Sequence, residues 1–300
     1  MPSPDLAYRG RFAPSPTGPL HLGSLIAALA SYLDARHCNG SWLVRIDDLD
    51  PPREEPGAAD NILHSLQCHG LHWDENILYQ GTRTSAYNAA LINLADRDHL
   101  FYCDCTRAIL STSGACDGRC NTSQTKKTDP AATRISVPFE QEILFKDRLQ
   151  GQEHTLLGQS LKNFVVKRKD KLFAYQLAVV VDDAEQGITH VVRGSDLLDS
   201  TPRQIFLQQC LIYPTPRYCH VPVITTRQGQ KFSKQNHAPA LDNSMAHSNL
   251  LSALRFLRQC KPPAMLSSVE QVLAYAVEHW SLEQVPAISS IPAAKIGVSA

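Results

Sequence analysis

The sequence predicts an α/β fold built on a parallel sheet, and three observations lead to this prediction. Strand-like and helix-like segments alternate between residues 8 and 94, which is the pattern of βαβ units. The alternation is lost from residue 101, where a polar stretch carries four clustered cysteines, and it returns after residue 171. Beyond residue 240 the pattern is helical. We therefore expect a parallel sheet that is interrupted, resumes, and is followed by a small helical region.

The first predicted strand, Tyr8 to Ala13, should lead into a helix through a proline-containing loop. Prolines at positions 14, 16 and 19 fix φ and remove backbone donors, so neither regular structure continues through them. Apolar residues at positions 25, 26, 29 and 33 then repeat at helical spacing. This spacing makes Ser24 the expected N-cap of a buried helix.

Two glycines, Gly18 and Gly23, flank His21 directly before this helix. Glycine leaves the backbone unobstructed, and a helix N-terminus supplies N–H groups and the positive end of the helix dipole, which together suit a nucleotide phosphate. The alternative is an ordinary strand-to-helix loop with a surface histidine, because Gly-rich turns are common. A phosphate site is our first hypothesis for this stretch.

The second predicted strand, Trp42 to Ile46, ends in an acidic turn at residues 47–53. Strand alternation places Arg45 and Asp47 on the same face. Because open parallel sheets bind ligands at the carboxyl ends of their strands, this turn should lie beside the 13–23 loop. Helices are expected over Ala58–Gly70 and from Thr84 to Leu94.

Four cysteines within eighteen residues predict a metal site in the polar stretch, and they are Cys103, Cys105, Cys116 and Cys120. The surrounding residues are rich in Ser, Thr, Gly, Asp and Lys and can form little apolar core. Four thiolates can replace that core by holding one Zn²⁺ in a closed tetrahedral site. Such a zinc ion is structural, because no coordination position stays open. The alternative is a chance cluster of free thiols.

The sheet should resume with a buried strand over Leu172–Val181, a nearly continuous apolar run that ends in two aspartates. Two further strands are expected over Ile188–Arg193 and His220–Thr226. Between them, the order of Thr, Pro and Gln predicts a helix over residues 202–211 with Thr201 as its N-cap.

The last part of the chain should hold a polar loop and then two helices. The loop contains Lys231 and Lys234, which can hold a triphosphate as point charges, although loop lysines are usually only solvated. The helices are expected over Ser248–Arg258 and Val269–Trp280, the second with a capping box formed by residues 267 and 270.

The composition is that of a globular enzyme without a membrane role. The 29 basic and 29 acidic side chains cancel, so any surface for nucleic acid must be a local patch. No apolar run approaches the roughly 20 residues of a membrane span, and the N-terminus lacks the apolar region of a signal peptide. We expect a cytoplasmic protein whose nine cysteines are thiols.

Four segments together resemble, in this order, the glutamyl branch of class I aminoacyl-tRNA synthetases. They are RFAPSPTGPLHLGS at 11–24, RIDDLD at 45–50, RGSDLL at 193–198 and KFSK at 231–234. HLGS is similar to the HIGH signature of that class, and the last segment resembles a degenerate KMSKS loop. The resemblance covers roughly residues 8–240. It implies a Rossmann-type catalytic domain in two halves, 1–100 and 171–240, separated by an inserted zinc-binding domain at 101–170 and followed by a helical region at 241–300.

Within that branch, the chain looks like a family of truncated paralogues. Only 65 residues follow Gln235, whereas glutamyl-tRNA synthetases carry a large anticodon-binding region at this point. The truncated family activates glutamate with ATP and transfers it to the queuosine base in the anticodon of tRNA(Asp). Its zinc knuckle also begins with Cys-x-Cys and ends in Cys, but its usual third ligand is a tyrosine where Cys116 stands here.

The resemblance also implies roles for individual residues. The glutamate-binding residues would be Arg11, Ser15, Asp47, Tyr175 and Arg193. An arginine fork suits a carboxylate and an acidic group suits the substrate ammonium. Asp47 stands where the family usually has glutamate, and its side chain is shorter by one methylene, a reach of roughly 1.5 Å.

The nucleotide side of the site is implied in the same way. Mg²⁺ would accompany ATP. Separately, the protein is expected to act as a monomer. The ATP-binding residues would be Gly18, His21, Gly23, Ser24 and Lys234, with His21, Lys231 and Lys234 taking part in catalysis.

Three other functions share parts of this pattern. A tRNA(Glu)-charging synthetase without its anticodon-binding domain has the same core. A nucleotidyltransferase with a HIGH-type loop and no RNA substrate would account for the phosphate loop. A zinc-stabilised RNA-binding module without catalysis would account for the cysteines.

Overall fold

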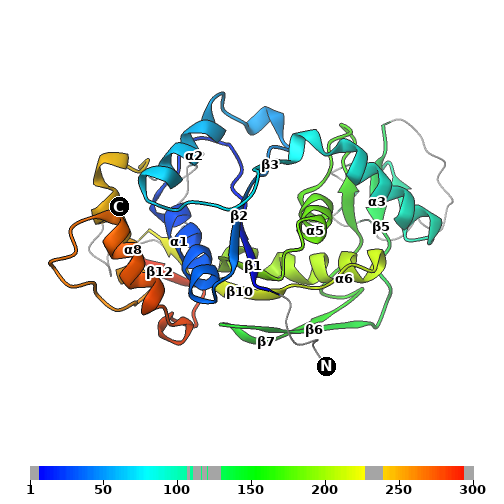
Figure 1. The fold of residues 1–300 in the computed structure, drawn as a ribbon. Coiled ribbons are helices and arrows are strands. Elements are labelled where there is room, and N and C mark those ends of the chain that lie inside the picture. Colours follow the sequence, from blue (N-terminus) through cyan, green and yellow to red (C-terminus); the bar gives the residue numbers. More distant parts are fainter. Residues whose placement is uncertain are drawn as a thin grey trace.

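A parallel sheet lies at the centre of the molecule (Figure 1). The structure is a computed structural model and describes residues 7–106, 109–110, 116, 120, 130–226 and 239–293. The sheet begins with β1 (Arg9–Phe12), β2 (Ser41–Ile46) and β3 (Leu78–Tyr79), with β2 in the middle. All three strands are parallel, and the register places Arg11 opposite Leu43.

The second group of parallel strands lies next to β1, where the Thr189 N–H donates to the Arg9 carbonyl at 3.0 Å. β9 (His190–Gly194) pairs with β10 (Arg217–Val221), and β11 (Val223–Thr225) pairs with β12 (Ser290–Pro292). The expectation of one strand over His220–Thr226 was therefore wrong. Pro222 separates two strands there, because it has no N–H to donate to a ladder.

Helix α1 (Leu22–His37) is buried between the sheet and two C-terminal helices, α7 (Ala246–Phe256) and α8 (Val269–Glu278) (Figure 1). Its apolar residues surround much of the helix, and Leu25, Leu29 and Leu33 are all fully buried. A helix that is apolar on several faces needs cover on more than one side. The sheet provides one side and the C-terminal helices provide the other.

Three helices pack together on the side of the sheet away from α7 and α8 (Figure 1). They are α3 (Thr84–Asp96), α5 (Tyr175–Glu185) and α6 (Thr201–Leu211). Helix α2 (Ala58–Cys68) lies between β2 and β3 in the chain. Short 3₁₀ turns occupy Pro51–Arg53, Gln80–Thr82, Ser195–Ser200, Asn243–Met245 and Leu282–Gln284. Among the described residues, the helices are too short or too polar for any of them to cross a bilayer.

The antiparallel strands all lie between residues 100 and 167. β4 (Leu100–Cys103), β5 (Ala132–Ile135) and β8 (Phe164–Lys167) form one small sheet. β6 (Glu142–Asp147) and β7 (Gly151–Leu156) form a hairpin that extends beneath β10 and α6 (Figure 1). The tip of this hairpin contacts the parallel strands, because the Arg148 N–H donates to the Tyr218 carbonyl at 2.9 Å.

The segment Leu172–Val181 is not the buried strand that its apolar run predicts. Residues Tyr175–Glu185 form α5, and all of Leu177–Asp183 is buried. A short apolar run fits either a buried strand or a buried helix, because periodicity cannot separate the two when every face is covered. The change matters for the site, since it places both following aspartates in the last turns of a helix.

Three predicted caps lie one to three residues from their observed positions. His21, not Ser24, caps α1, and its Nδ1 accepts the Ser24 N–H at 3.2 Å. Ser200 precedes α6, whose first residue is Thr201. The capping box of α8 is formed by Ser268 and Gln271.

Candidate active site

A cavity of about 190 Å³ opens at the carboxyl ends of β1 and β9, beside the N-terminus of α1. Its wall is formed by the ends of these two strands, the start of α1 and the connection between β10 and β11. Its lining includes six of the residues singled out from the sequence, which are Arg11, His21, Gly23, Ser24, Tyr175 and Arg193. The parallel arrangement of the strands explains this convergence, because it brings their carboxyl ends to one edge.

The wall next to α1 is formed by His21 and Gly23. The Nδ1 atom of His21 accepts the Ser24 N–H, so the proton of a neutral ring is on Nε2, which lies 3.2 Å from Ser24 Oγ. A Cβ atom on Gly23 would lie 3.0 Å from both His21 Cε1 and Ile224 Cγ2. Glycine is therefore needed here for close packing, and the helix N-terminus stays next to the cavity.

Arg11 belongs to a buried ion cluster below the cavity. Arg11 Nε lies 3.2 Å from Asp183 Oδ1, and Arg45 Nη1 lies 2.6 Å from the same oxygen. Arg45 Nε lies 2.8 Å from Asp47 Oδ1, which confirms that Arg45 and Asp47 share a face. The cluster joins β1, the end of β2 and α5, so the α5 aspartate fixes the direction of the Arg11 guanidinium.

The two carboxylates of this cluster have pKa values that move in opposite directions. Burial raises the pKa of Asp47 to about 6, and its contact with Arg45 compensates only in part. Burial also acts on Asp183, but the neighbouring Arg11 and Arg45 guanidiniums outweigh it and lower the pKa of that group. The difference follows from geometry, since Asp183 contacts two guanidiniums and Asp47 contacts one.

Arg193 is held by uncharged partners. Its Nε donates to His220 Nε2 at 3.0 Å, its Nη2 donates to Thr201 Oγ1 at 2.8 Å, and its Nη1 lies 3.4 Å from the Tyr175 hydroxyl. His220 in turn contacts Asp147 through Nδ1 at 2.6 Å. Burial lowers the pKa of His220, which favours the neutral ring.

The other predicted site residues lie outside the cavity wall. Ser15 is exposed in the loop between β1 and α1. Gly18 lies in the same loop, where a Cβ atom would lie 2.8 Å from the carboxylate of Glu55. Asp47 lies in the ion cluster. The acidic turn does lie beside the first loop as expected, because the Asp47 N–H donates to the Pro14 carbonyl at 3.0 Å. Lys231 and Lys234 fall outside the described residues.

Three polar residues near the cavity were given no role from the sequence. Asp183 was placed at the end of a predicted strand, so its contact with Arg11 could not be foreseen. Asp147 and His220 are 73 residues apart and carry no motif that links them. One signal for Asp183 was available in the sequence. Two aspartates follow directly after an apolar, buried segment, and buried aspartates usually have a charged partner.

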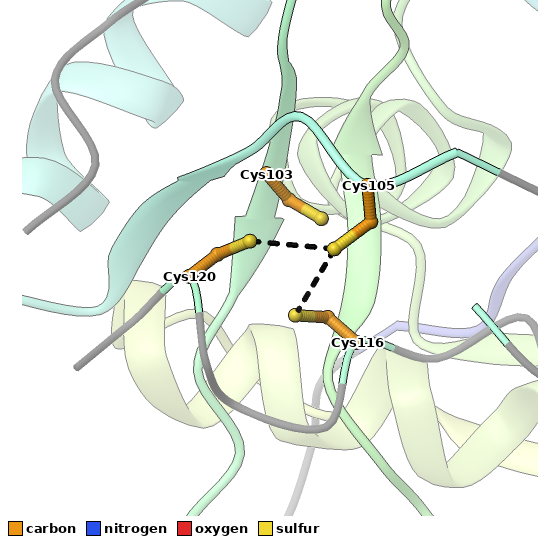
Figure 2. A group of neighbouring side chains, drawn as sticks. All are labelled: Cys103, Cys105, Cys116 and Cys120. Atoms are coloured by element: carbon orange, nitrogen blue, oxygen red, sulfur yellow. Dashed lines mark hydrogen bonds between the residues drawn. The ribbon is translucent and has the colours of Figure 1, made fainter. Parts of the chain in front are cut away.

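The four clustered cysteines form a separate site at the end of β4 (Figure 2). Cys103, Cys105, Cys116 and Cys120 are all buried, and their sulfur atoms lie within 4.8 Å of one another. The Cys105 sulfur lies 4.0 Å from that of Cys116 and 3.4 Å from that of Cys120.

These distances fit a metal ion. A tetrahedral zinc–thiolate site with bonds of about 2.3 Å separates its sulfurs by roughly 3.8 Å. The only other apolar side chains in the cluster are Phe101 and the partly buried Leu110, counting the residues that the structure describes. Lys169 donates to the carbonyls of Asp104 and Cys105 at 2.7 and 2.9 Å, which holds the first ligand pair in place. The four cysteines can hold one ion.

Comparison with known proteins agrees with the fold. Residues 7–255 match the family model of class I tRNA synthetases (E and Q), catalytic domain. A glutamate-tRNA synthetase structure from Elizabethkingia anophelis has a TM-score of 0.79 at 22% identity, covering 97% of this chain and 69% of that chain. The protein therefore belongs to the class I tRNA synthetases of the E and Q type, and it is a ligase.

Curated relatives narrow the family further. A glutamyl-Q tRNA(Asp) synthetase from Pseudomonas fluorescens is 48% identical over 98% of this chain and 99% of its own length. One from Escherichia coli is 49% identical over 94% of this chain and 92% of its own length. The chain belongs to the glutamyl-Q tRNA(Asp) synthetase family.

Proposed function

We propose that the protein activates glutamate with ATP and transfers it to the queuosine base in the anticodon of tRNA(Asp). One observation carries the proposal: Arg11 and Arg193 line the same cavity as the N-terminus of α1. Glutamate has two carboxylates and ATP has a triphosphate, so two guanidiniums beside a helix N-terminus match both substrates. The curated relatives are named glutamyl-Q tRNA(Asp) synthetases, which agrees with this proposal.

The amino-acid side of the cavity would work through charge. Arg193 donates to His220, Tyr175 and Thr201 and, at 3.4 Å, to the Leu197 carbonyl, and all four partners are uncharged. Its guanidinium therefore keeps its full charge for a substrate carboxylate. Arg11 is paired with the Asp183 carboxylate, which compensates part of its charge. Tyr175 lines the cavity, and we assign Ser15 and Asp47 to the amino-acid side of the site as well, although both lie outside the cavity wall. Ionised Asp47 would attract the substrate ammonium from the ion cluster below the cavity.

The nucleotide side would use the α1 N-terminus, with Gly18, His21, Gly23 and Ser24 next to the phosphates. The loop with Lys231 and Lys234 is assigned to the triphosphate. The described residues on both sides of that loop support this assignment. Ile224 lines the cavity before it, and Ala240 forms a bridge with His21 after it.

The chemistry needs no protein nucleophile. The α-carboxylate of glutamate attacks the α-phosphorus of ATP, the bond to the β-phosphate breaks, and pyrophosphate leaves. A hydroxyl of the queuosine cyclopentenediol then attacks the carbonyl of the glutamyl-adenylate, and AMP leaves. Positioning and charge stabilisation supply the catalysis. Mg²⁺ bound with ATP would neutralise phosphate charge.

We assign Zn²⁺ to the four-cysteine site in a structural role. Four protein ligands fill a tetrahedral shell, and the site supports a segment that has little apolar core of its own. We propose a cytoplasmic location, where ATP and tRNA are available as substrates, and action as a monomer.

The test is glutamate-dependent exchange of pyrophosphate into ATP, measured without tRNA. We expect exchange with glutamate and background rates with glutamine and aspartate. A second assay then offers labelled glutamate with queuosine-containing tRNA(Asp) or with tRNA(Glu). Labelling of tRNA(Glu) alone would overturn the proposal in favour of an ordinary glutamyl-tRNA synthetase.

A further inference from the structure

A buried chain of hydrogen bonds connects the inserted hairpin to the cavity. Asp147, at the end of β6, contacts His220 on β10, and His220 contacts Arg193 on β9. The exposed fractions are 1% for Asp147, 0% for His220 and 5% for Arg193. Burying a connected chain of polar groups costs desolvation free energy. Because this chain lies next to a binding site, we expect a functional role that offsets that cost.

The donors and acceptors of this chain allow one arrangement. Arg193 Nε can only donate, so His220 Nε2 must accept and carries no proton. The proton of the ring is then on Nδ1 and is donated to Asp147 Oδ2 at 2.6 Å. Asp147 therefore selects the tautomer of His220, and that tautomer holds the Nε edge of Arg193.

The same chain places a negative charge near Arg193 without neutralising it. Asp147 is separated from the guanidinium by the neutral imidazole, whereas Asp183 contacts Arg11 directly. The Nη1 group of Arg193 is left pointing toward Tyr175 in the cavity wall. The guanidinium is fixed along one edge and remains available along the other.

Asp147 is itself fixed by the turn of the hairpin. Its Oδ1 accepts the N–H groups of Leu149 at 3.0 Å and Gln150 at 2.8 Å, and it also accepts the N–H of His220 at 3.2 Å. The Gln150 side chain donates to the His220 carbonyl at 2.7 Å. The hairpin tip is thus attached to β10 at the same residue whose side chain holds Arg193.

We infer that Asp147 and His220 are positioning residues that orient Arg193 for a substrate carboxylate, so that the inserted hairpin completes the amino-acid pocket. This inference rests on the proposed function, because it takes Arg193 as a glutamate-binding residue. It adds two residues, neither of which lines the cavity, to the determinants of amino-acid binding.

The main test variant is Asp147→Asn. Its amide keeps an oxygen for the two turn N–H groups, but its NH₂ group then faces His220 Nδ1. The ring must accept there and move its proton to Nε2, which opposes the Nε–H of Arg193. We expect the KM for glutamate in pyrophosphate exchange to rise about tenfold, while the KM for ATP stays within about twofold.

Two substitutions of His220 make the test specific. His220→Gln keeps an acceptor near the position of Nε2, so this variant should retain most of the wild-type affinity for glutamate. His220→Leu has no acceptor and should match Asp147→Asn. His69→Gln is the matched control, because His69 is also fully buried and hydrogen-bonded, but its partners Ser65 and Asn249 do not line the cavity, whereas Arg193, the partner of His220, does. It should leave the KM for glutamate unchanged.

The outcomes separate this inference from the proposed function. If the wild-type protein shows no glutamate-dependent exchange, the proposed function is wrong and the inference is wrong with it. If the wild type is active and folded Asp147→Asn has an unchanged KM for glutamate, the inference alone is wrong. Equal rises in KM for glutamate and ATP would also overturn it, since they indicate a general structural role. If Asp147→Asn does not fold, the comparison of His220→Gln with His220→Leu decides.

Discussion

Replacement of Arg45 by methionine should expose how strongly the buried ion cluster depends on one side chain. Arg45 is fully buried, and its guanidinium lies 2.8 Å from Asp47 and 2.6 Å from Asp183. In the Arg45→Met variant, Arg11 is the one arginine of the cluster left for two buried carboxylates. Removal of one partner from a buried pair costs about 3–5 kcal/mol. We expect the free energy of unfolding to fall by about this amount at neutral pH.

The assay is urea unfolding followed by circular dichroism, with Arg53→Met as the matched control. Arg53 pairs with Asp50 at 2.6 Å, but its side chain is 69% exposed, and surface pairs contribute at most about 1 kcal/mol. The pH dependence sharpens the test. In the folded protein the pKa of Asp47 is raised from 3.8 to about 6. The folded state therefore loses stability as the pH rises between these two values and Asp47 ionises.

Loss of Arg45 should raise the pKa of Asp47 further, because the opposite charge that favours its ionised form is gone. The destabilisation should therefore become smaller as the pH is lowered from 7 toward 4. A loss below about 1 kcal/mol at neutral pH would refute the cluster as described. A loss that does not change with pH would refute the part assigned to Asp47.

Three further predictions concern the active site and the four-cysteine site. The KM for glutamate should rise as the pH falls below about 6, because protonated Asp47 no longer attracts the substrate ammonium, and Asp47→Asn should show a high KM at every pH. Metal analysis should find one zinc per chain, and removal of zinc by a chelator should lower the thermal midpoint by several degrees; Cys116→Ser should do the same. Gly23→Ala should raise the KM for ATP by roughly tenfold to a hundredfold, because the new Cβ would lie 3.0 Å from His21 and Ile224.

Each of these predictions has its own control. A KM for glutamate that is flat between pH 5 and 8 would argue against Asp47 as an ammonium partner. Cys38 is exposed, so Cys38→Ser should leave the zinc content unchanged, and equal zinc loss in both cysteine variants would contradict the cluster. Gly57 has a left-handed φ of 77° with no atom near its Cβ position, so Gly57→Ala should cost stability but leave the KM for ATP unchanged.

The first half of the fold could be predicted from the sequence because its signals are local. Proline positions end the first strand, and the helical spacing after them places the start of α1 within three residues of the observed one. The segment before Asp182 could not be assigned in this way. Every residue of Leu177–Val181 is buried in α5, so hydrophobicity alone did not distinguish a helix from a strand.

The candidate site was predictable where residues lie in one short motif or where the family resemblance implies them, as it does for Tyr175 and Arg193. Arg11 and His21 lie in the same short stretch, and the structure brings both to the cavity. The partners that fix the guanidiniums come from distant segments. Asp183 is 172 residues from Arg11, and His220 is 27 residues from Arg193, so sequence spacing carries no information about these contacts. The His21 cap was missed for a different reason, because an imidazole is an uncommon N-cap.

The most direct test of the proposed activity is to find where labelled glutamate is attached on tRNA(Asp). The protein is incubated with ATP, labelled glutamate and queuosine-containing tRNA(Asp), and the product is cut by a base-specific nuclease under mildly acidic conditions. We predict that the label stays on the anticodon fragment and is absent when the tRNA lacks queuosine. Label on the 3′-terminal fragment, or equal labelling without queuosine, would contradict the account.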